Sequence, residues 1–146
     1  MKTLIHLLLA TTATLGLLAD ARAGESHDHS HSHAAPVAIP DTLDELWKNI
    51  AAGHAKLDEA LEKKDIPAAH EAEQSLQAWL KALPAKCDKA DAAARSRIEG
   101  QARNLARAYD GIHHDSDHKD WDKATGSLKK AAGALKLLEA QVKKAL

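Results

Sequence analysis

The sequence predicts an all-α protein, an up-down-up-down four-helix bundle that follows a disordered, histidine-rich N-terminal tail. Alanine and leucine dominate while Val and Ile are scarce, and the 146 residues include no Phe, three Trp and one Tyr. This composition favours helix over strand at nearly every position. Apolar residues recur three and four positions apart in four stretches, and no stretch alternates with period 2. Because the breaks between the stretches are short, successive helices should run antiparallel.

The first residues have the organisation of an export signal. Met1-Lys2 gives a short positive start, residues 4–18 are rich in Leu, Ala and Thr, and Ala21-Arg22-Ala23 supplies the small residues that a signal peptidase recognises. The apolar run is shorter than the ~20 residues of a membrane span, although a retained anchor is the alternative. We therefore expect residues 1–23 to be a cleaved signal peptide, which would leave no stable membrane anchor and place the mature protein in a bacterial periplasm.

Residues 24–40 form the predicted flexible tail, which contains a run of alternating histidines. Its candidate metal ligands are His27, Asp28, His29, His31 and His33. Imidazole is a common ligand of divalent transition metals, and a flexible strand can fold several imidazoles around one ion. Almost nothing in the run is apolar, so core packing does not explain it. The alternative is a solvated low-complexity spacer with no selected metal.

The bundle is expected to span residues 41–146, and its first two helices lie before Pro84. Asp41 or Thr42 can cap the first helix, and Lys63-Lys64 give its end the charge that a helix C-terminus favours. Asp65 can cap the second helix, which Pro84 is expected to stop. The apolar seams of these two helices include Leu43, Trp47, Ile50, Leu57, Leu61, Leu76, Leu80 and Leu83.

The third helix is predicted from about Asp88 to Tyr109 or Ile112, and a break follows at residues 110–117. The seams of the last two helices include Ala94, Ile98, Leu105, Ala108, Trp121, Ala124, Leu128, Leu135, Leu138 and Val142. Candidates for the cap of the fourth helix are Asp115, Ser116 and Asp117.

A second group of histidines is expected at the end of the bundle that holds the first and third turns. Its members are His70, His113, His114 and His118. His70 lies about one turn into the second helix, and the other three lie in or beside the predicted break. We expect His70, His114 and His118 to be able to form a metal site, helped by Asp115 or Asp117. The alternative is that these residues are only solvated caps and turns.

His54 lies on an apolar seam, and we interpret it as a core histidine hydrogen-bonded to a neighbour, with an internal metal ligand as the alternative. Glu73, Asp91 and Gln101 also fall on or near seams and could form a polar layer with His54 or His70. A di-iron site would need Glu-x-x-His pairs on different helices, and the sequence has none. Haem held by Met and His is excluded because the only methionine is the first residue.

Charge, motifs and ligand types exclude several classes of function. A formal net charge of −1 does not suggest binding to nucleic acid or to an anionic membrane. Without a P-loop, G-x-G-x-x-G, G-x-S-x-G or H-E-x-x-H sequence, we expect neither an enzyme nor a nucleotide cofactor. The ligand types suit zinc, nickel, cobalt or copper(II) better than copper(I). Cys87, the single cysteine, is interpreted as a half-buried apolar residue at a helix start; an intermolecular disulfide or a ligand role is the alternative.

Three features resemble a group of small periplasmic helical proteins associated with heavy-metal resistance and RND-type cation efflux. They are Leu43-x-x-Leu46-Trp47-x-x-Ile50, the run Ala69-His70-Glu71-Ala72, and the Asp-rich break before a Lys/Leu-rich last helix. The resemblance covers residues 43–146 and implies a periplasmic accessory to metal homeostasis, with a metal efflux complex as partner. The break in that group is rich in Leu-Asp and Gly-Asp, whereas this chain adds histidines, so the resemblance supplies no ligand set.

Two functions therefore compete. The first is a periplasmic protein that binds a divalent metal ion and buffers it, hands it on or confers resistance. The second is a helical interaction module that docks on an efflux or envelope partner, with the histidine tail incidental. Helical seams of this kind also serve dimers, so a homodimer is a further possibility.

Overall fold

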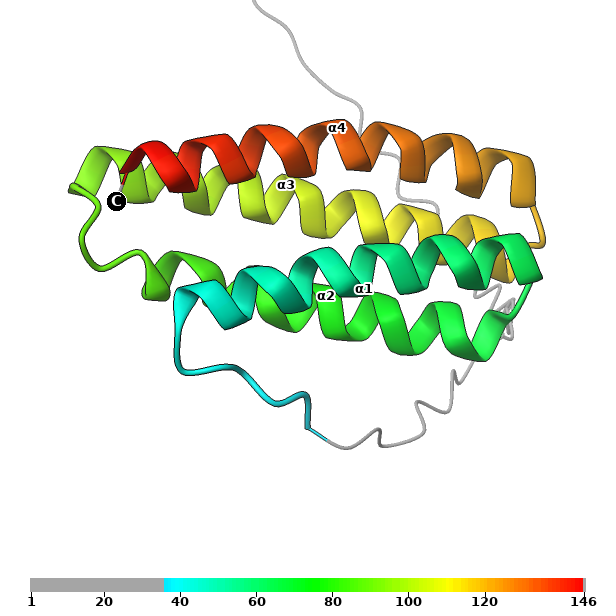
Figure 1. Ribbon diagram of the computed structural model, residues 1–146. Coiled ribbons are helices and arrows are strands. Elements are labelled where there is room, and N and C mark those ends of the chain that lie inside the picture. Colours follow the sequence, from blue (N-terminus) through cyan, green and yellow to red (C-terminus); the bar gives the residue numbers. More distant parts are fainter. Residues whose placement is uncertain (1–35, 146) are drawn as a thin grey trace, which may run out of the picture. The chain divides into compact units, whose positions relative to one another are not determined.

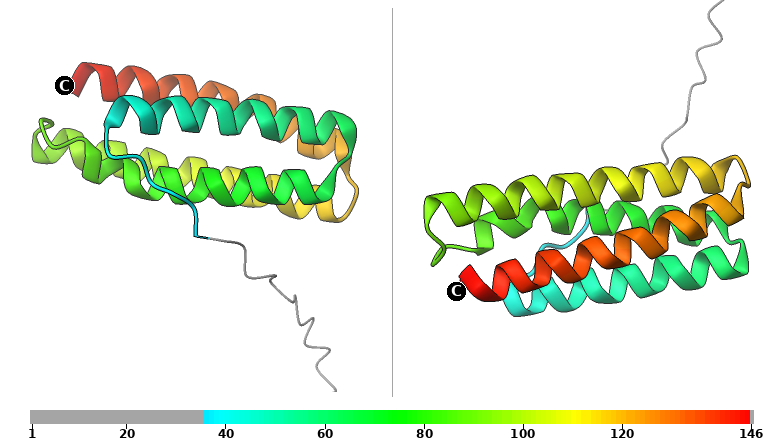
Figure 2. Two further views of the ribbon diagram at one scale, coloured as in Figure 1. Left: turned by 60° about the horizontal axis from the view of Figure 1, so that its bottom comes forward. Right: turned by 90° about the horizontal axis from the view of Figure 1, so that it is seen from above.

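The computed structural model describes residues 36–145, which fold into four helices and contain no strand. The helices are α1 (Leu43–Lys63), α2 (Ile66–Lys86), α3 (Ala92–Asp117) and α4 (Trp121–Ala145). Each helix packs against the next in sequence, and α1 also packs against α4 (Figure 1). The α1–α2 and α3–α4 turns lie at one end and the α2–α3 connection at the other (Figure 2). The predicted up-down-up-down four-helix bundle is confirmed.

The N-terminal predictions fall mainly outside this part of the chain. Residues 1–35, and with them the predicted signal peptide and the tail ligands His27, Asp28, His29, His31 and His33, lie outside the described residues. Within residues 36–145, no helix combines the length and the hydropathy that crossing a bilayer requires.

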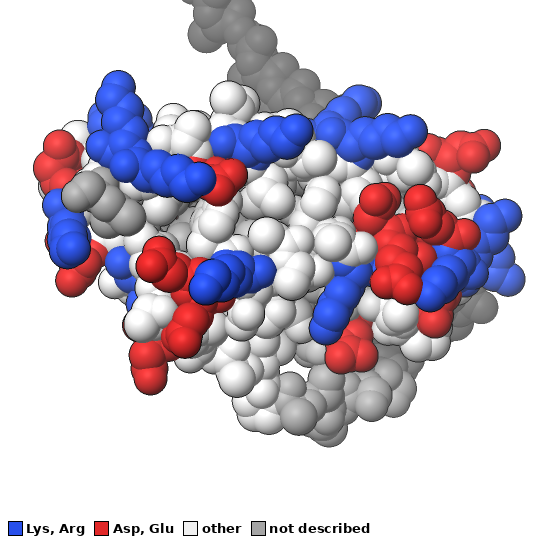
Figure 3. Space-filling model, viewed as in Figure 1, with Lys and Arg blue, Asp and Glu red and all other residues white. Residues whose placement is uncertain are grey.

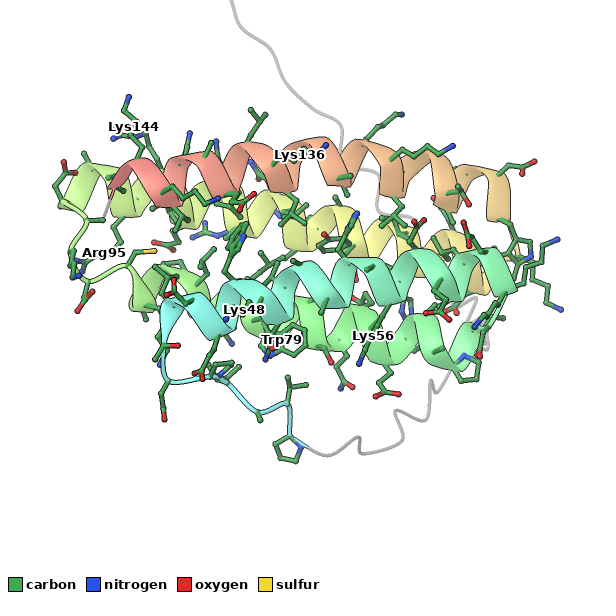
Figure 4. The ribbon with its side chains drawn as sticks, viewed as in Figure 1. Lys48, Lys56, Trp79, Arg95, Lys136 and Lys144 are labelled. Carbon is green, nitrogen blue, oxygen red and sulfur yellow. The ribbon has the colours of Figure 1, made fainter. Side chains whose placement is uncertain are left out.

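Residues 36–42 approach the bundle as an irregular segment held against α2. The Trp79 indole nitrogen donates a hydrogen bond to the carbonyl of Ala38 at 3.0 Å (Figure 4). The ammonium group of Lys86 donates to the carbonyl of Asp41, also at 3.0 Å. The chain is therefore fixed to the surface of α2 before α1 begins.

All four helices begin beside an oxygen-bearing side chain that accepts a hydrogen bond from a backbone N–H three residues later. These caps are Thr42, Asp65, Asp91 and Asp120. Such caps satisfy amide groups that the helix itself leaves without a partner. Thr42 and Asp65 were predicted. Asp91 is an exposed cap rather than part of a polar layer, and none of the three residues expected to cap α4 does so.

The predicted break at residues 110–117 is wrong, because α3 continues to Asp117. Gly111 lowers helix propensity here, but Ile112 on the next position is completely buried in the core. Packing of this face keeps the backbone helical and confines the turn to residues 118–120. Lys119 makes the turn with a left-handed backbone (φ 59°).

Two further boundaries differ from expectation. Helix α3 begins at Ala92 rather than near Asp88, and α2 continues past Pro84 to Lys86. Cys87 follows as the C-terminal cap of α2, not at a helix start, and it is fully buried rather than half-buried. Its Sγ lies 3.4 Å from the carbonyl of Leu83, and burial raises the pKa of the thiol. It is a packed apolar residue of the core.

Leucines and alanines from all four helices form one core, as the composition suggested. Fully buried members include Leu46, Ile50, Leu57, Leu76, Leu80, Leu83, Ile98, Leu105, Leu128 and Leu138. Buried alanines allow the helix backbones to approach closely. Gly53 of α1 has the same effect against α2. A β-carbon on Gly53 would lie 2.9 Å from Cζ3 of Trp79 and 3.1 Å from Leu76. The α1–α2 contact therefore depends on a missing side chain.

Charge is distributed unevenly over the face seen in Figure 3. Lys side chains follow α4, whereas acidic side chains form one group toward the opposite end and another toward the end at which α1 meets α2. The last turns of α1 contribute Asp58, Glu59 and Glu62 there.

Candidate metal site

Two helices bring His70, His113 and Asp117 together. His70 lies in the first turns of α2, and His113 and Asp117 lie four residues apart in the last turns of α3. Four residues are about one helical turn, so His113 and Asp117 share a face of α3. Each of the three residues offers one ligand atom, and these atoms all lie within 4.8 Å of one another. We call this group the triad.

The Asp117 carboxylate spans both imidazoles of the triad. Nε2 of His70 lies 2.7 Å from Oδ1 of Asp117, and Nε2 of His113 lies 3.2 Å from Oδ2. The two rings stack with centroids 4.0 Å apart and planes inclined by 18°. Both imidazoles therefore present the same nitrogen to one carboxylate.

The surroundings of Asp117 favour its ionised form. Partial burial acts to raise its pKa, but the hydrogen bond with His70 and the charges of His113, His70 and His118 act in the opposite direction and prevail. The pKa of Asp117 is therefore lower than its ordinary value. The triad keeps an anionic ligand over a wide pH range.

Glu73 supports His113 from the side away from Asp117. Only 7% of Glu73 is exposed, and its Oε2 lies 3.3 Å from Nδ1 of His113. The contact has ion-pair distance but not hydrogen-bond alignment, so the buried Nδ1 has no hydrogen-bond partner within residues 36–145. The amide of Gln77 donates to the other oxygen of Glu73. Burial raises the pKa of Glu73, against the opposing charge of His113.

Carboxylates beside the non-ligating nitrogen of a histidine are common around bound metals. They orient the ring, fix its tautomer and increase the basicity of the ligating nitrogen. A small rotation of the His113 ring would let Nδ1–H donate to Glu73 while Nε2 faces His70 and Asp117. The order Glu73–His113–Asp117 thus has the chemistry of a supported metal ligand.

The structure does not bring His70 together with His114 and His118. His114 and His118 contact each other, with ring centroids 4.5 Å apart, and His113 takes the place beside His70. The reason is the helical conformation of residues 110–117, which turns His114 about 100° away from His113. Asp115, offered as a helper, is buried and its Oδ1 accepts from Lys123 at 2.7 Å. Asp117, the other helper, is in the triad.

The predicted hydrogen bond of His54 to a neighbour is present, but its side chain is half-buried rather than fully in the core. Its Nδ1 lies 2.9 Å from the hydroxyl of Tyr109, whose side chain is fully buried. Burial lowers the pKa of His54, although the nearby charge of Asp58 opposes the shift. The expected polar layer does not form, because Glu73 contacts His113. The buried Oε1 of Gln101 has no hydrogen-bond partner among the residues that the structure describes.

The donor set fits a borderline divalent ion. Zinc–nitrogen and zinc–oxygen bonds are ~2.0–2.2 Å, so atoms sharing one ion lie at most ~4 Å apart. The triad atoms are within 4.8 Å, and small side-chain rotations would bring them to that spacing. Because the two rings are stacked, binding must turn at least one of them so that both lone pairs point to one position. Three protein ligands would leave room for water or another donor.

Sequence reasoning overlooked Glu73 as a partner of His113 and paired the wrong histidines. The signal was present in the run His113-His114-Asp115-Ser116-Asp117-His118, which contains two overlapping i, i+4 pairs. The pairs become visible only when the run is taken as helix. Glu73, three residues after His70, lies on the same face of α2.

No family model, no curated protein and no solved structure matches this chain.

Proposed function

We propose that this protein binds a divalent transition metal ion at the triad His70–His113–Asp117. The observation that carries the proposal is the meeting of two imidazole Nε2 atoms on one carboxylate, contributed by two helices. An imidazole–carboxylate set suits zinc, nickel, cobalt or copper(II). Support from the buried Glu73 favours this assignment over an ordinary surface ion pair.

The exposure of the triad favours reversible binding, as in metal buffering or hand-off. The side chains of His70, His113 and Asp117 are 42%, 30% and 34% exposed. An ion held by three ligands at the surface keeps positions open for exchange. Metal ligands bind in their deprotonated forms, so acidification would promote release.

Other parts of the proposal rest on the sequence. The tail residues His27, Asp28, His29, His31 and His33 would bind the same class of ion by their imidazole and carboxylate groups. The leader-like residues 1–23 support export to a periplasm. The resemblance described above supports a partner in metal efflux. With no catalytic constellation proposed, the protein would be a binder rather than an enzyme.

Calorimetric titration tests the triad in a protein whose tail histidines are replaced, so that they do not contribute to the measured binding. The reference protein carries His27→Ala, His29→Ala, His31→Ala and His33→Ala, and it is titrated with zinc, nickel, cobalt and copper(II) near neutral pH. Adding His113→Ala or Asp117→Asn to this background should abolish the tight step. Glu99→Gln, which removes an exposed carboxylate elsewhere on α3, is the matched control and should leave binding unchanged.

A stability measurement on the same proteins separates loss of binding from loss of folding. A ligand at 100 times its Kd stabilises the native state by about 2.7 kcal/mol. The reference and Glu99→Gln proteins should show this gain with metal, and Asp117→Asn should fold normally without it. If the reference protein binds no metal, or if Asp117→Asn binds as tightly as the reference, the triad is not the site. The docking module would then be the better explanation.

A further inference from the structure

We propose that His114 and His118 form a second metal site, separate from the triad and facing solvent. The two residues are four positions apart at the end of α3, and their ring centroids lie 4.5 Å apart with planes inclined by 50°. Histidines at i and i+4 on one helix can direct a nitrogen each to the same point. The continuation of α3 through residues 110–117 is what creates this pair.

The environment of the pair leaves its nitrogens available. The His114 side chain is 71% exposed, and His118 is also exposed. The nearest carboxylate oxygen to His114 is Oδ1 of Asp115, 3.9 Å from Nδ1, and that oxygen already accepts from Lys123. Among residues 36–145, neither imidazole has a carboxylate as close as those beside His70 and His113.

The chemistry of the pair identifies the class of ion it would take. Two imidazoles without a bound carboxylate favour borderline ions, with copper(II) strongest in the order of divalent affinities. Two protein ligands leave more positions to water than the three of the triad. The pair should therefore bind more weakly and exchange more readily.

The two sites are close enough to influence each other. His118 follows Asp117 directly in the chain, so an ion held by His114 and His118 would lie close to the triad. Its positive charge would repel a second cation at the triad and weaken binding there. By reciprocity, an ion in the triad would weaken binding at the pair. Filling should thus occur in two steps, first the triad and then the pair.

Imidazole NMR of the full chain tests this inference residue by residue. Zinc, which is diamagnetic, is titrated into the protein that carries Ala at positions 27, 29, 31 and 33, and ring nitrogen shifts are followed by long-range ¹H–¹⁵N correlation. We expect His70 and His113 to shift with the first equivalent, and His114 and His118 to shift together at higher zinc. His118→Ala should abolish the later shift of His114, whereas Asn104→Ala, an exposed substitution on the same helix, should not.

Binding at the His114–His118 pair can be distinguished from binding at the triad. In His113→Ala the paired shift of His114 and His118 should persist and move to lower zinc, because the competing cation is absent. If His114 and His118 stay unshifted at millimolar zinc, or shift independently of each other, there is no second site. If all four histidines shift in one step and His113→Ala removes every shift, there is a single larger site instead.

Discussion

The hydroxyl of Tyr109 lies 2.9 Å from Nδ1 of His54, so a polar contact links α3 to α1. Tyr109 is fully buried and its pKa is strongly raised by burial, which keeps the phenol protonated as a donor. Burial lowers the pKa of His54, which favours its neutral ring. Burial thus favours the neutral form of both groups, and two neutral groups can share one hydrogen bond.

Removing this hydroxyl should destabilise the bundle. Tyr109→Phe keeps the ring volume but leaves the half-buried Nδ1 of His54 without a partner, a loss of about 1–3 kcal/mol. Urea denaturation measures the change in free energy of unfolding. In a double-mutant cycle, His54→Gln and Tyr109→Phe should be strongly non-additive. Additive effects would show that the two side chains do not depend on each other.

His54 should make the stability depend on pH. Since its pKa in the folded state is below the ordinary 6.5, the unfolded chain binds the proton more readily. The stabilisation is complete above pH ~6.5 and is lost as the pH falls through the folded-state pKa. Denaturation midpoints between pH 5 and 8 should decline on the acidic side, and His54→Gln should flatten the decline. An equally steep decline in His54→Gln would assign it to other groups.

Two glycines should respond oppositely to the same substitution. Gly53→Ala places a methyl group 2.9 Å from the Trp79 ring and 3.1 Å from Leu76, and overpacking of this kind costs ~1–3 kcal/mol. In the described part of the chain, no packing neighbour lies within 4 Å of a methyl group at Gly133, so Gly133→Ala should stabilise α4 by ~0.8–1 kcal/mol through helix propensity. Thermal unfolding compares them. A stabilised Gly53→Ala protein would mean that α1 and α2 are not tightly packed there.

Glu73→Gln should separate metal affinity from fold stability. Losing the carboxylate beside His113 should lower metal affinity about 10–100-fold, as for other groups that support a metal ligand. The metal-free protein should be as stable or more stable at neutral pH, because a carboxyl group with a raised pKa is destabilising when ionised. Calorimetry and denaturation provide the two readouts. Unchanged zinc affinity would remove Glu73 from the site.

Much of the fold could be predicted because the helix signals are local. The seam from Leu43 to Leu61 and the caps Thr42 and Asp65 act within a turn or two of their own positions, so neighbouring residues suffice to identify them. The end of α3 could not be found in this way. Gly111 and the Asp-rich run favour a break locally, and burial of Ile112 against other helices overrides them.

The candidate site shows the same division. The sequence alone identified the histidines of the turn end and named His70 and Asp117 among the possible ligands. Which histidine joins them depends on whether residues 110–117 are helical. Because α3 continues through them, His113 faces His70 and His114 faces His118 instead. Glu73 is part of the site only because α2 packs against α3, which brings its carboxylate to His113.

By itself, then, the sequence determined the number, order and direction of the helices and the residue types available as ligands. Only the tertiary structure decided which of those residues meet. Periodicity and caps are properties of neighbouring residues, whereas the triad joins positions 47 residues apart in the chain. Such a meeting depends on how α2 and α3 pack along their whole length, and that packing balances side-chain burial over the entire core.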